Sequence, residues 1–166
     1  MDTLCKTSKG DLILRNDTDA VLPPFWVEKI EKHFMDDPAL DACGGKWFSS
    51  DGPAYICHAV RYGYYIFDPI FKIFNGHYFI SGTNFAIRSS TLKKINYYQT
   101  QKNIDANDQI IYGKLKKYKC KFRRFNDCWL WHTSRRWNEK PWLVFYEMVS
   151  FIFPKLYKTR SKHPLS

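Results

Sequence analysis

The chain has 166 residues and a formal net charge of +10, with 26 Lys and Arg residues against 16 Asp and Glu residues. This length suits one domain with its own core, and 45% hydrophobic and 25% charged residues exclude an intrinsically disordered chain. No apolar run approaches the roughly 20 residues that span a bilayer, and no apolar signal segment follows Met1. Five cysteines without a CxxC pair indicate reduced thiols, so we expect a cytoplasmic protein.

The charge is concentrated in the second half of the chain. Residues 1–83 contain 8 basic and 11 acidic side chains, whereas residues 84–166 contain 18 basic and 5 acidic ones. A net charge of −3 against +13 predicts that the second half faces an anionic partner such as a nucleotide, a phospholipid surface or nucleic acid. Nucleic acid is the least favoured of these partners, because no recognised nucleic-acid motif is present.

The first third of the chain predicts a strand, a helix and a second strand. Residues 11–16 form a short apolar run between polar residues, which is typical of a buried strand. A helix is expected after Pro23-Pro24, with Trp26, Ile30 and Phe34 on one buried side and an end at residues 36–38. A strand is then expected over residues 40–48, around a pair of glycines.

The remaining elements continue the alternation of helices and strands. We expect a broken helix over 53–74, a turn and strand over 79–88, a short helix capped by residues 89–91, a helix from Asp105 to about residue 118, a strand over 120–132 and a helix over 141–157. This order predicts an α/β sandwich in one catalytic domain over 1–140, followed by an aromatic and basic helix and tail over 141–166.

Asp17-Thr18-Asp19 follows directly after the first expected strand. Two carboxylates separated by one residue can converge on a hard divalent cation such as Mg²⁺ or Mn²⁺, which prefers oxygen ligands and bridges phosphates. Ligands of open α/β sheets gather outside the carboxyl ends of strands. The alternative is a solvated turn, in which aspartate is common.

Asp108 is a second candidate. It shares a helical face with Ile104, Ile111 and Leu115, and burial there would raise the pKa of its carboxyl toward that of a general base. The alternative is a capping role in the first helical turn, close to Asp105. The residues alone favour the capping role.

A third cluster spans residues 131–137 and contains His132, Arg135 and Arg136. The arginines offer forked donors for pyrophosphate oxygens, and the imidazole is a candidate third metal ligand. The alternatives are a satisfied histidine and a solvated arginine pair. No cysteine and histidine pairs have the spacing of a structural zinc site, so the sequence predicts none.

Taken in order, these motifs resemble the second half of a family 2 glycosyltransferase with a GT-A fold. The matching segments are Gly10–Leu14 running into Asp17-Thr18-Asp19, then Gly82–Arg88, Asn107-Asp108 and Thr133–Arg136. The resemblance covers about residues 4–140. It implies a partial GT-A-like, Rossmann-like α/β/α sandwich with a mixed sheet, followed by a C-terminal amphipathic helix.

The resemblance also implies roles for individual residues. Asp17 and Asp19 correspond to the pair that holds Mn²⁺ or Mg²⁺ against a nucleotide-sugar donor, and Asp108 to the catalytic base of inverting members. The donor and acceptor site would contain Gly82, Asn84, Arg88, Arg135 and Arg136, with His132 as a further metal ligand. The implied reaction is metal-dependent sugar transfer to a glycan or lipid-linked acceptor, as in polysaccharide biosynthesis.

Two features depart from the family pattern. Asn107 occupies the position of the first acid in the usual acidic pair. Only 16 residues precede Asp17, whereas the family's nucleotide-binding half lies before this motif. We therefore expect a fragment, a subunit whose N-terminal half comes from a separate chain, or an inactive glycosyltransferase.

The segment from residue 141 to about 160 is aromatic and flanked by lysines and arginines. This composition is typical of a helix lying in the membrane interface, here the cytoplasmic face, although packing on the domain or on a second copy is the alternative. A non-enzymatic basic module that binds anionic membrane or nucleic acid is the alternative function, since it would account for the charge of the second half.

Overall fold

The computed structural model describes residues 8–79, 81–96, 107–133, 140 and 142. The chain divides into two compact units, Met1–Trp47 with Ile80–Trp131, and Phe48–Phe79 with His132–Ser166. The elements in chain order are β1 (Leu12–Arg15), β2 (Ala20–Val21), α2 (Trp26–Asp36), β3 (Ala42–Ser49), α3 (Ala54–Asn75), β4 (Phe85–Arg88), α4 (Ser89–Lys94), α5 (Asn107–Lys117) and β5 (Phe122–His132). The expected helix over 141–157 lies outside the described residues, apart from Trp142.

Five strands form one mixed sheet in the order β1-β4-β3-β5-β2. β4 is antiparallel to both β1 and β3. β3 and β5 are parallel. A hydrogen bond joins Asp41 N to Lys121 O at the start of both strands, and another joins Ser50 N to His132 O at the end of both. The predicted α/β class and mixed sheet are thus confirmed. β1 was expected to be buried, but as an edge strand it is only half-buried.

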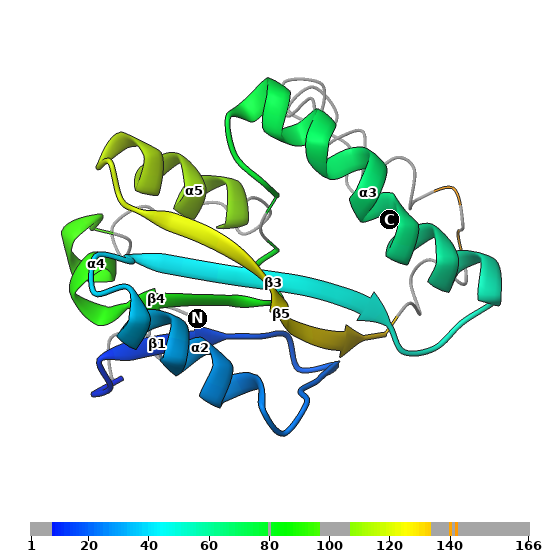
Figure 1. Ribbon diagram of the computed structural model, residues 1–166, viewed down its shortest axis with the longest axis horizontal. Helices are drawn as coiled ribbons and strands as arrows, with labels where there is room; N and C mark the ends of the chain where they lie inside the picture. Colours follow the sequence, from blue (N-terminus) through cyan, green and yellow to red (C-terminus); the bar gives the residue numbers. More distant parts are fainter. Residues whose placement is uncertain (1–7, 80, 97–106, 134–139, 141, 143–166) are drawn as a thin grey trace, which may run out of the picture. The chain divides into compact units, whose positions relative to one another are not determined.

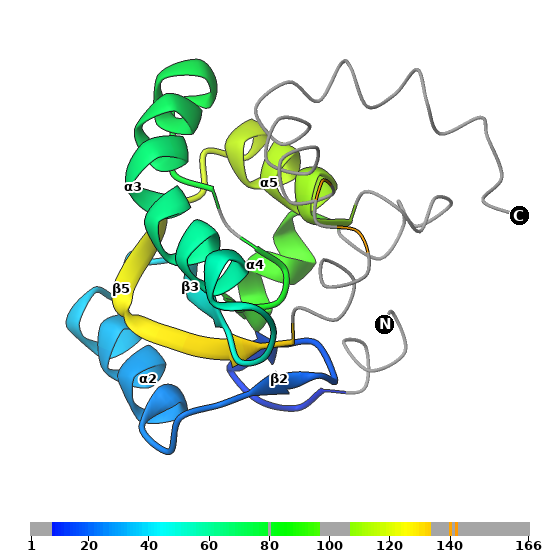
Figure 2. The ribbon, with the colours of Figure 1, turned by 90° about the vertical axis from the view of Figure 1, so that its right-hand side faces the viewer.

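The sheet of the first unit has a helical layer on each face, as Figures 1 and 2 show. α2 covers one face with Trp26, Ile30 and Phe34, the three residues that the sequence pattern predicted. Their cluster includes Cys43 of β3 and Cys128 of β5. On the other face, α4 and α5 pack residues including Leu92, Ile95, Ile111 and Leu115 against alternate side chains of the same strands. Because consecutive strand residues point to opposite faces, β3 and β4 contribute to both clusters.

The predicted cap of α4 is wrong. Residues 89–91 lie inside the helix, its N-cap is Arg88, and no side chain caps it. The Thr91 hydroxyl instead donates to Asp41 Oδ1 at 2.7 Å, and Asp41 Oδ2 accepts from Lys121 N at 2.7 Å. Asp41 therefore links α4 to the start of β5, and this use of the Thr91 hydroxyl replaces capping.

α3, in the second unit, is one continuous helix of 22 residues rather than the broken helix expected. Pro69 removes one backbone donor, at a cost of about 3 kcal/mol, but the buried stripe of Ile56, Val60 and Phe71 continues past it. The helix ends at Gly76, whose φ of 81° allows its N–H to donate to Lys72 O at 2.7 Å. Among the described helices, none combines the length and hydropathy needed to cross a membrane.

Candidate functional site

The Asp17-Thr18-Asp19 motif forms the turn between β1 and β2. In the antiparallel pair of β1 and β4, Arg15 lies opposite Phe85, so the end of β1 adjoins the loop that precedes β4. Thr83, in this loop, donates its hydroxyl hydrogen to Asp17 Oδ2 at 2.7 Å. The backbone N–H of Ala20 donates to Asp17 O at 3.1 Å and closes the turn. Two motifs 66 residues apart in the sequence thus meet through a hydrogen bond.

The two predicted carboxylate ligands come together at this turn. The ligand oxygens of Asp17 and Asp19 lie within 4.8 Å of each other. His132, the predicted third ligand, is the last residue of β5 and belongs to the second unit. Asp17 and His132 are half-buried and Asp19 is exposed. His132 Nδ1 lies 2.7 Å from the carbonyl oxygen of Thr133, which can only accept, so the proton of the neutral ring is on Nδ1. That tautomer has its lone pair on Nε2, the form in which imidazole binds metals. The two carboxylates at one turn fit a hard divalent cation, and the imidazole of His132 presents a nitrogen lone pair of the kind that binds metals.

Asn84 holds the loop before β4 in place. Its side chain is fully buried, and Oδ1 accepts from Trp26 Nε1 at 3.1 Å. Nδ2 donates to Lys46 O at 2.8 Å and to Cys128 O at 2.7 Å. One amide thereby joins α2, β3, β4 and β5 immediately beside Thr83. All three of these bonds go to protein groups, so the geometry supports positioning of the loop.

Gly45 of β3 allows the backbone of β5 to approach closely. A Cβ atom on Gly45 would lie 1.5 Å from the carbonyl oxygen of Cys128 and 2.6 Å from Asn84 Nδ2. Its backbone N–H donates to Asn84 O at 3.2 Å. A side chain at this position would overlap the hydrogen bond from Asn84 Nδ2 to Cys128 O, so only glycine fits. Sequence analysis did not identify Gly45, Thr83 or Trp26 as site residues, although the glycine pair was a signal for close backbone approach.

Gly82 lines a small cavity of about 20 Å³ on the α5 side of the sheet. The other lining residues are Arg15, Phe85, Ile111, Tyr112, Leu115 and Phe122. Burial raises the pKa of the Tyr112 phenol to about 12, so its hydroxyl stays protonated near neutral pH. The cavity has room for about one water molecule, and it adjoins the loop that carries Thr83.

Arg88 is not brought to this turn. It pairs with Leu12 at the opposite end of β1 from Asp17. Its Nε donates to Leu40 O at 2.8 Å and its Nη2 to Phe34 O at 3.0 Å. Phe34 O belongs to the last turn of α2, where carbonyl groups have no hydrogen-bond donor within the helix. The Arg88 guanidinium supplies that donor.

The remaining predicted site residues are described only in part. Asp108 lies at the start of the described part of α5, inside the helix that was expected from Asp105 to about residue 118. Arg135 and Arg136 lie outside the described residues, as does the expected cap at Asp105.

Comparison with known proteins identifies a family for the chain. No curated protein matches the chain. The family model for glycosyl transferase family 2 matches residues 1–96, more than half of the chain. This segment includes the turn of Asp17 and Asp19, the glycine of β3 and the loop before β4. The chain therefore belongs to glycosyl transferase family 2.

Proposed function

We propose that the protein transfers a sugar from a nucleoside-diphosphate donor to a hydroxyl group of a glycan or lipid-linked acceptor, with inversion at the anomeric carbon. Asp17, Asp19 and His132 would hold Mn²⁺ or Mg²⁺, and the observation that carries this proposal is that the ligand oxygens of Asp17 and Asp19 lie within 4.8 Å of each other at one turn. A cation bound there supplies positive charge beside the donor diphosphate.

In this proposal Asp108 accepts the proton of the acceptor hydroxyl. The hydroxyl oxygen forms a bond to the anomeric carbon, the bond from that carbon to the diphosphate oxygen breaks, and the nucleoside diphosphate leaves with the electron pair. Arg135 and Arg136 would pair with the departing diphosphate through forked donors. Gly82, in the loop fixed by Asn84, would face the sugar. Arg88 would act on this loop only through β4, because its guanidinium is used at the end of α2.

The structure supports the proposal by orienting Asp17. Asp17 Oδ2 accepts a hydrogen bond from the Thr83 hydroxyl at 2.7 Å, which fixes this oxygen. The direction of the other carboxylate oxygen, Oδ1, is therefore also restricted. The Thr83 hydroxyl is itself held by a loop whose next residue, Asn84, is fully buried. Such support of a ligand by a neighbouring hydrogen bond is typical of metal sites and is not required in a solvated turn.

Thermal melting with Mn²⁺ and a panel of UDP-, GDP- and dTDP-sugars tests donor binding. A ligand that binds only the folded chain raises the melting temperature, by about 2.7 kcal/mol of added stability at 100 times its dissociation constant. We expect one nucleotide to give a metal-dependent rise that Asp19→Asn abolishes. Asp36→Asn, an exposed carboxylate at the end of α2, is the matched control and should keep the rise. A rise that survives in Asp19→Asn would contradict the site.

Transfer assays separate catalysis from donor binding. Asp108→Asn should lower kcat by about 10²–10⁴-fold while the metal-dependent rise in melting temperature persists. Full activity of Asp108→Asn would refute its role as the base. Donor binding with no transfer by the parent chain would identify an inactive glycosyltransferase. Salt-dependent binding of RNA or anionic vesicles, without any effect of metal or nucleotide-sugar, would instead favour the basic binding module.

A further inference from the structure

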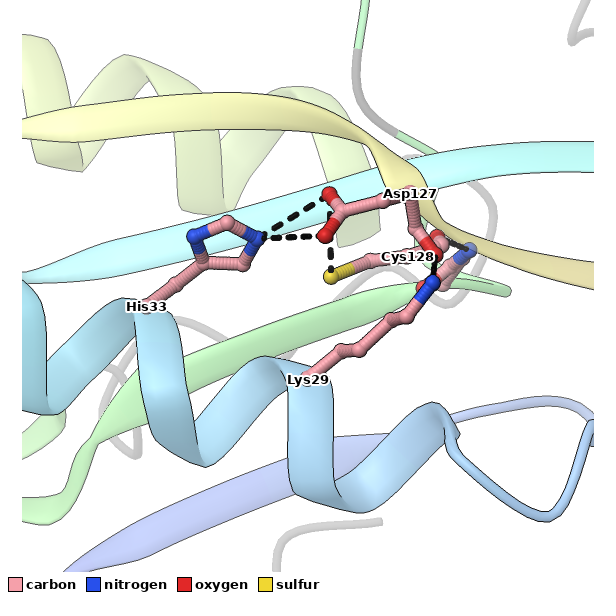
Figure 3. A network of polar contacts seen from close by, with 5 residues as sticks. Lys29, His33, Asp127 and Cys128 are labelled. Atoms are coloured by element: carbon pink, nitrogen blue, oxygen red, sulfur yellow. Dashed lines mark hydrogen bonds and ion pairs between the residues drawn. The ribbon is translucent and has the colours of Figure 1, made fainter.

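A second cluster of metal-ligating atoms lies in the first unit, between α2 and β5, and Figure 3 shows its side chains. The ligand atoms of His33, Asp127 and Cys128 lie within 4.8 Å of one another. His33 Nε2 lies 3.0 Å from Asp127 Oδ1 and 3.1 Å from Oδ2. The Cys128 thiol points at Oδ1 of the same carboxylate, with Sγ at 3.9 Å.

An irregularity in β5 makes this cluster possible. Consecutive residues of a regular strand point to opposite faces, yet Asp127 and Cys128 share one group of contacts. Between the same two hydrogen bonds, β3 advances nine residues, from Asp41 to Ser50, whereas β5 advances eleven, from Lys121 to His132. The extra residues indicate a bulge in β5, a feature that turns a side chain toward a new direction.

The three side chains differ in burial and are held by their neighbours. Cys128 is fully buried, whereas the side chains of His33 and Asp127 are 22% and 46% exposed. The His33 ring stacks on Phe125 at 3.6 Å between centroids, with an interplanar angle of 7°. Lys29 is the neighbouring cation, and its ammonium group lies 3.4 Å from Asp127 O and 4.2 Å from the centre of the Phe25 ring.

We propose that His33, Asp127 and Cys128 bind a zinc-class divalent cation that fastens α2 to β5. Zinc binds nitrogen and oxygen at about 2.0–2.1 Å and thiolate sulfur at about 2.3 Å, so ligands around a tetrahedral ion lie about 3.3–3.6 Å apart. The observed separations of 3.0 Å and 3.9 Å bracket this range. Small side-chain shifts therefore suffice, and the exposed rim leaves the fourth position to water.

Binding of the cation displaces protons that the thiol and the imidazole carry in the metal-free protein. The Cys128 thiol and His33 Nε2, which faces the Asp127 carboxylate, release their protons to solvent, and the Cys128 sulfur becomes a thiolate. Burial, together with the Asp127 carboxylate, raises the pKa of the Cys128 thiol to about 12, while Lys29 lowers it. Because thiolate and unprotonated imidazole nitrogen are the forms that bind metals, metal binding releases protons.

The donor atoms separate this site from the turn of Asp17 and Asp19. Thiolate and imidazole select zinc or cobalt, whereas a pair of carboxylates suits Mg²⁺ or Mn²⁺. His33 and Asp127 are 94 residues apart, which explains why no zinc spacing was visible in the sequence. The inference does not depend on the proposed sugar transfer.

Cobalt titration of the full metal-free chain tests the site directly. A cobalt–thiolate bond produces a charge-transfer absorption band in the near ultraviolet, and tetrahedral cobalt absorbs strongly in the visible range. We expect both signals to saturate at one equivalent and to be displaced by zinc. Cys128→Ser should abolish the charge-transfer band, whereas Cys57→Ser, a half-buried cysteine of the second unit, should retain it.

A second variant tests the site independently if Cys128→Ser does not fold. His33→Gln changes a partly exposed ligand, leaves the thiol in place, and should weaken cobalt binding by at least about 10–100-fold, with circular dichroism confirming the fold. Asp19→Asn should retain both bands, which separates this site from the donor site. Absence of the charge-transfer band in the folded parent chain, or its persistence unchanged in Cys128→Ser or His33→Gln, would overturn the proposal.

Discussion

Replacing Asn84 with alanine should strongly destabilise the site and the sheet around it. The change removes the partner of Trp26 Nε1 and of two carbonyl oxygens, those of Lys46 and Cys128. Water can reach the half-buried Lys46, but the other two partners are buried. At about 1–3 kcal/mol for each buried group left without a partner, we expect a loss of about 2–6 kcal/mol. That is a large part of the total stability of about 5–15 kcal/mol that is usual for a domain.

The isosteric Asn84→Asp variant separates hydrogen bonding from volume. It keeps an oxygen for Trp26 and loses both amide donors, so a carboxylate would face two carbonyl oxygens. Burial raises the pKa of such a carboxyl in the folded state, and the folded chain therefore binds more protons than the unfolded one. The defect of Asn84→Asp should consequently shrink as the pH falls, because the protonated carboxyl regains one donor.

Urea unfolding followed by tryptophan fluorescence measures both variants. Asn126→Ala, at an exposed position of β5, is the matched control and should change the free energy of unfolding by less than about 0.5 kcal/mol. A loss below about 1 kcal/mol in Asn84→Ala, the net value of a single ordinary hydrogen bond, would refute the central role given to this amide.

Three further predictions concern other contacts. Thr83→Val removes the hydrogen bond to Asp17 and should raise the Mn²⁺ concentration needed for half-maximal donor binding by about 10–100-fold; an unchanged requirement in a metal titration would contradict this. Gly45→Ala forces a Cβ against a backbone carbonyl oxygen and should cost at least about 1–3 kcal/mol in urea unfolding, whereas unaltered stability would show that the strands are not so close. Burial alone would raise the pKa of Asp127, but the hydrogen bond and charge of His33 outweigh it and hold that pKa below its usual value. The free energy of unfolding of Asp127→Asn should therefore be up to about 1 kcal/mol lower than that of the parent near neutral pH. This difference in stability should disappear as the pH falls through the carboxyl range. A difference that does not change with pH would exclude the ion pair as its cause.

Local patterns predicted the elements whose burial follows a simple period. Trp26, Ile30 and Phe34 recur every four residues, and all three are buried in α2. The strand after Cys120 and the helix that begins at Asn107 also follow the pattern of their apolar residues. The two-residue β2 is too short to show any period, so its place at the edge of the sheet could not be predicted.

The candidate ligands stand out in the sequence, whereas the residues that support them do not. Asp17 and Asp19 stand out because two acids follow an apolar run. Thr83, Asn84 and Gly45 act through contacts with residues far away in the sequence, and nothing in their own neighbourhoods reveals those partners. The broken helix expected over 53–74 is instead continuous in α3, even through Pro69, because packing of one helix face outweighs a local propensity.

The most direct test of the central claim is the binding of Mn²⁺ itself, followed by the loss of the free-ion signal in electron paramagnetic resonance. The titration uses the full chain with its donor nucleotide-sugar, the parent beside Asp17→Asn and Asp19→Asn. We predict one saturable Mn²⁺ in the parent and about 10–100-fold or greater weakening in each variant. Equal Mn²⁺ binding by all three proteins would contradict a metal site at the turn after β1.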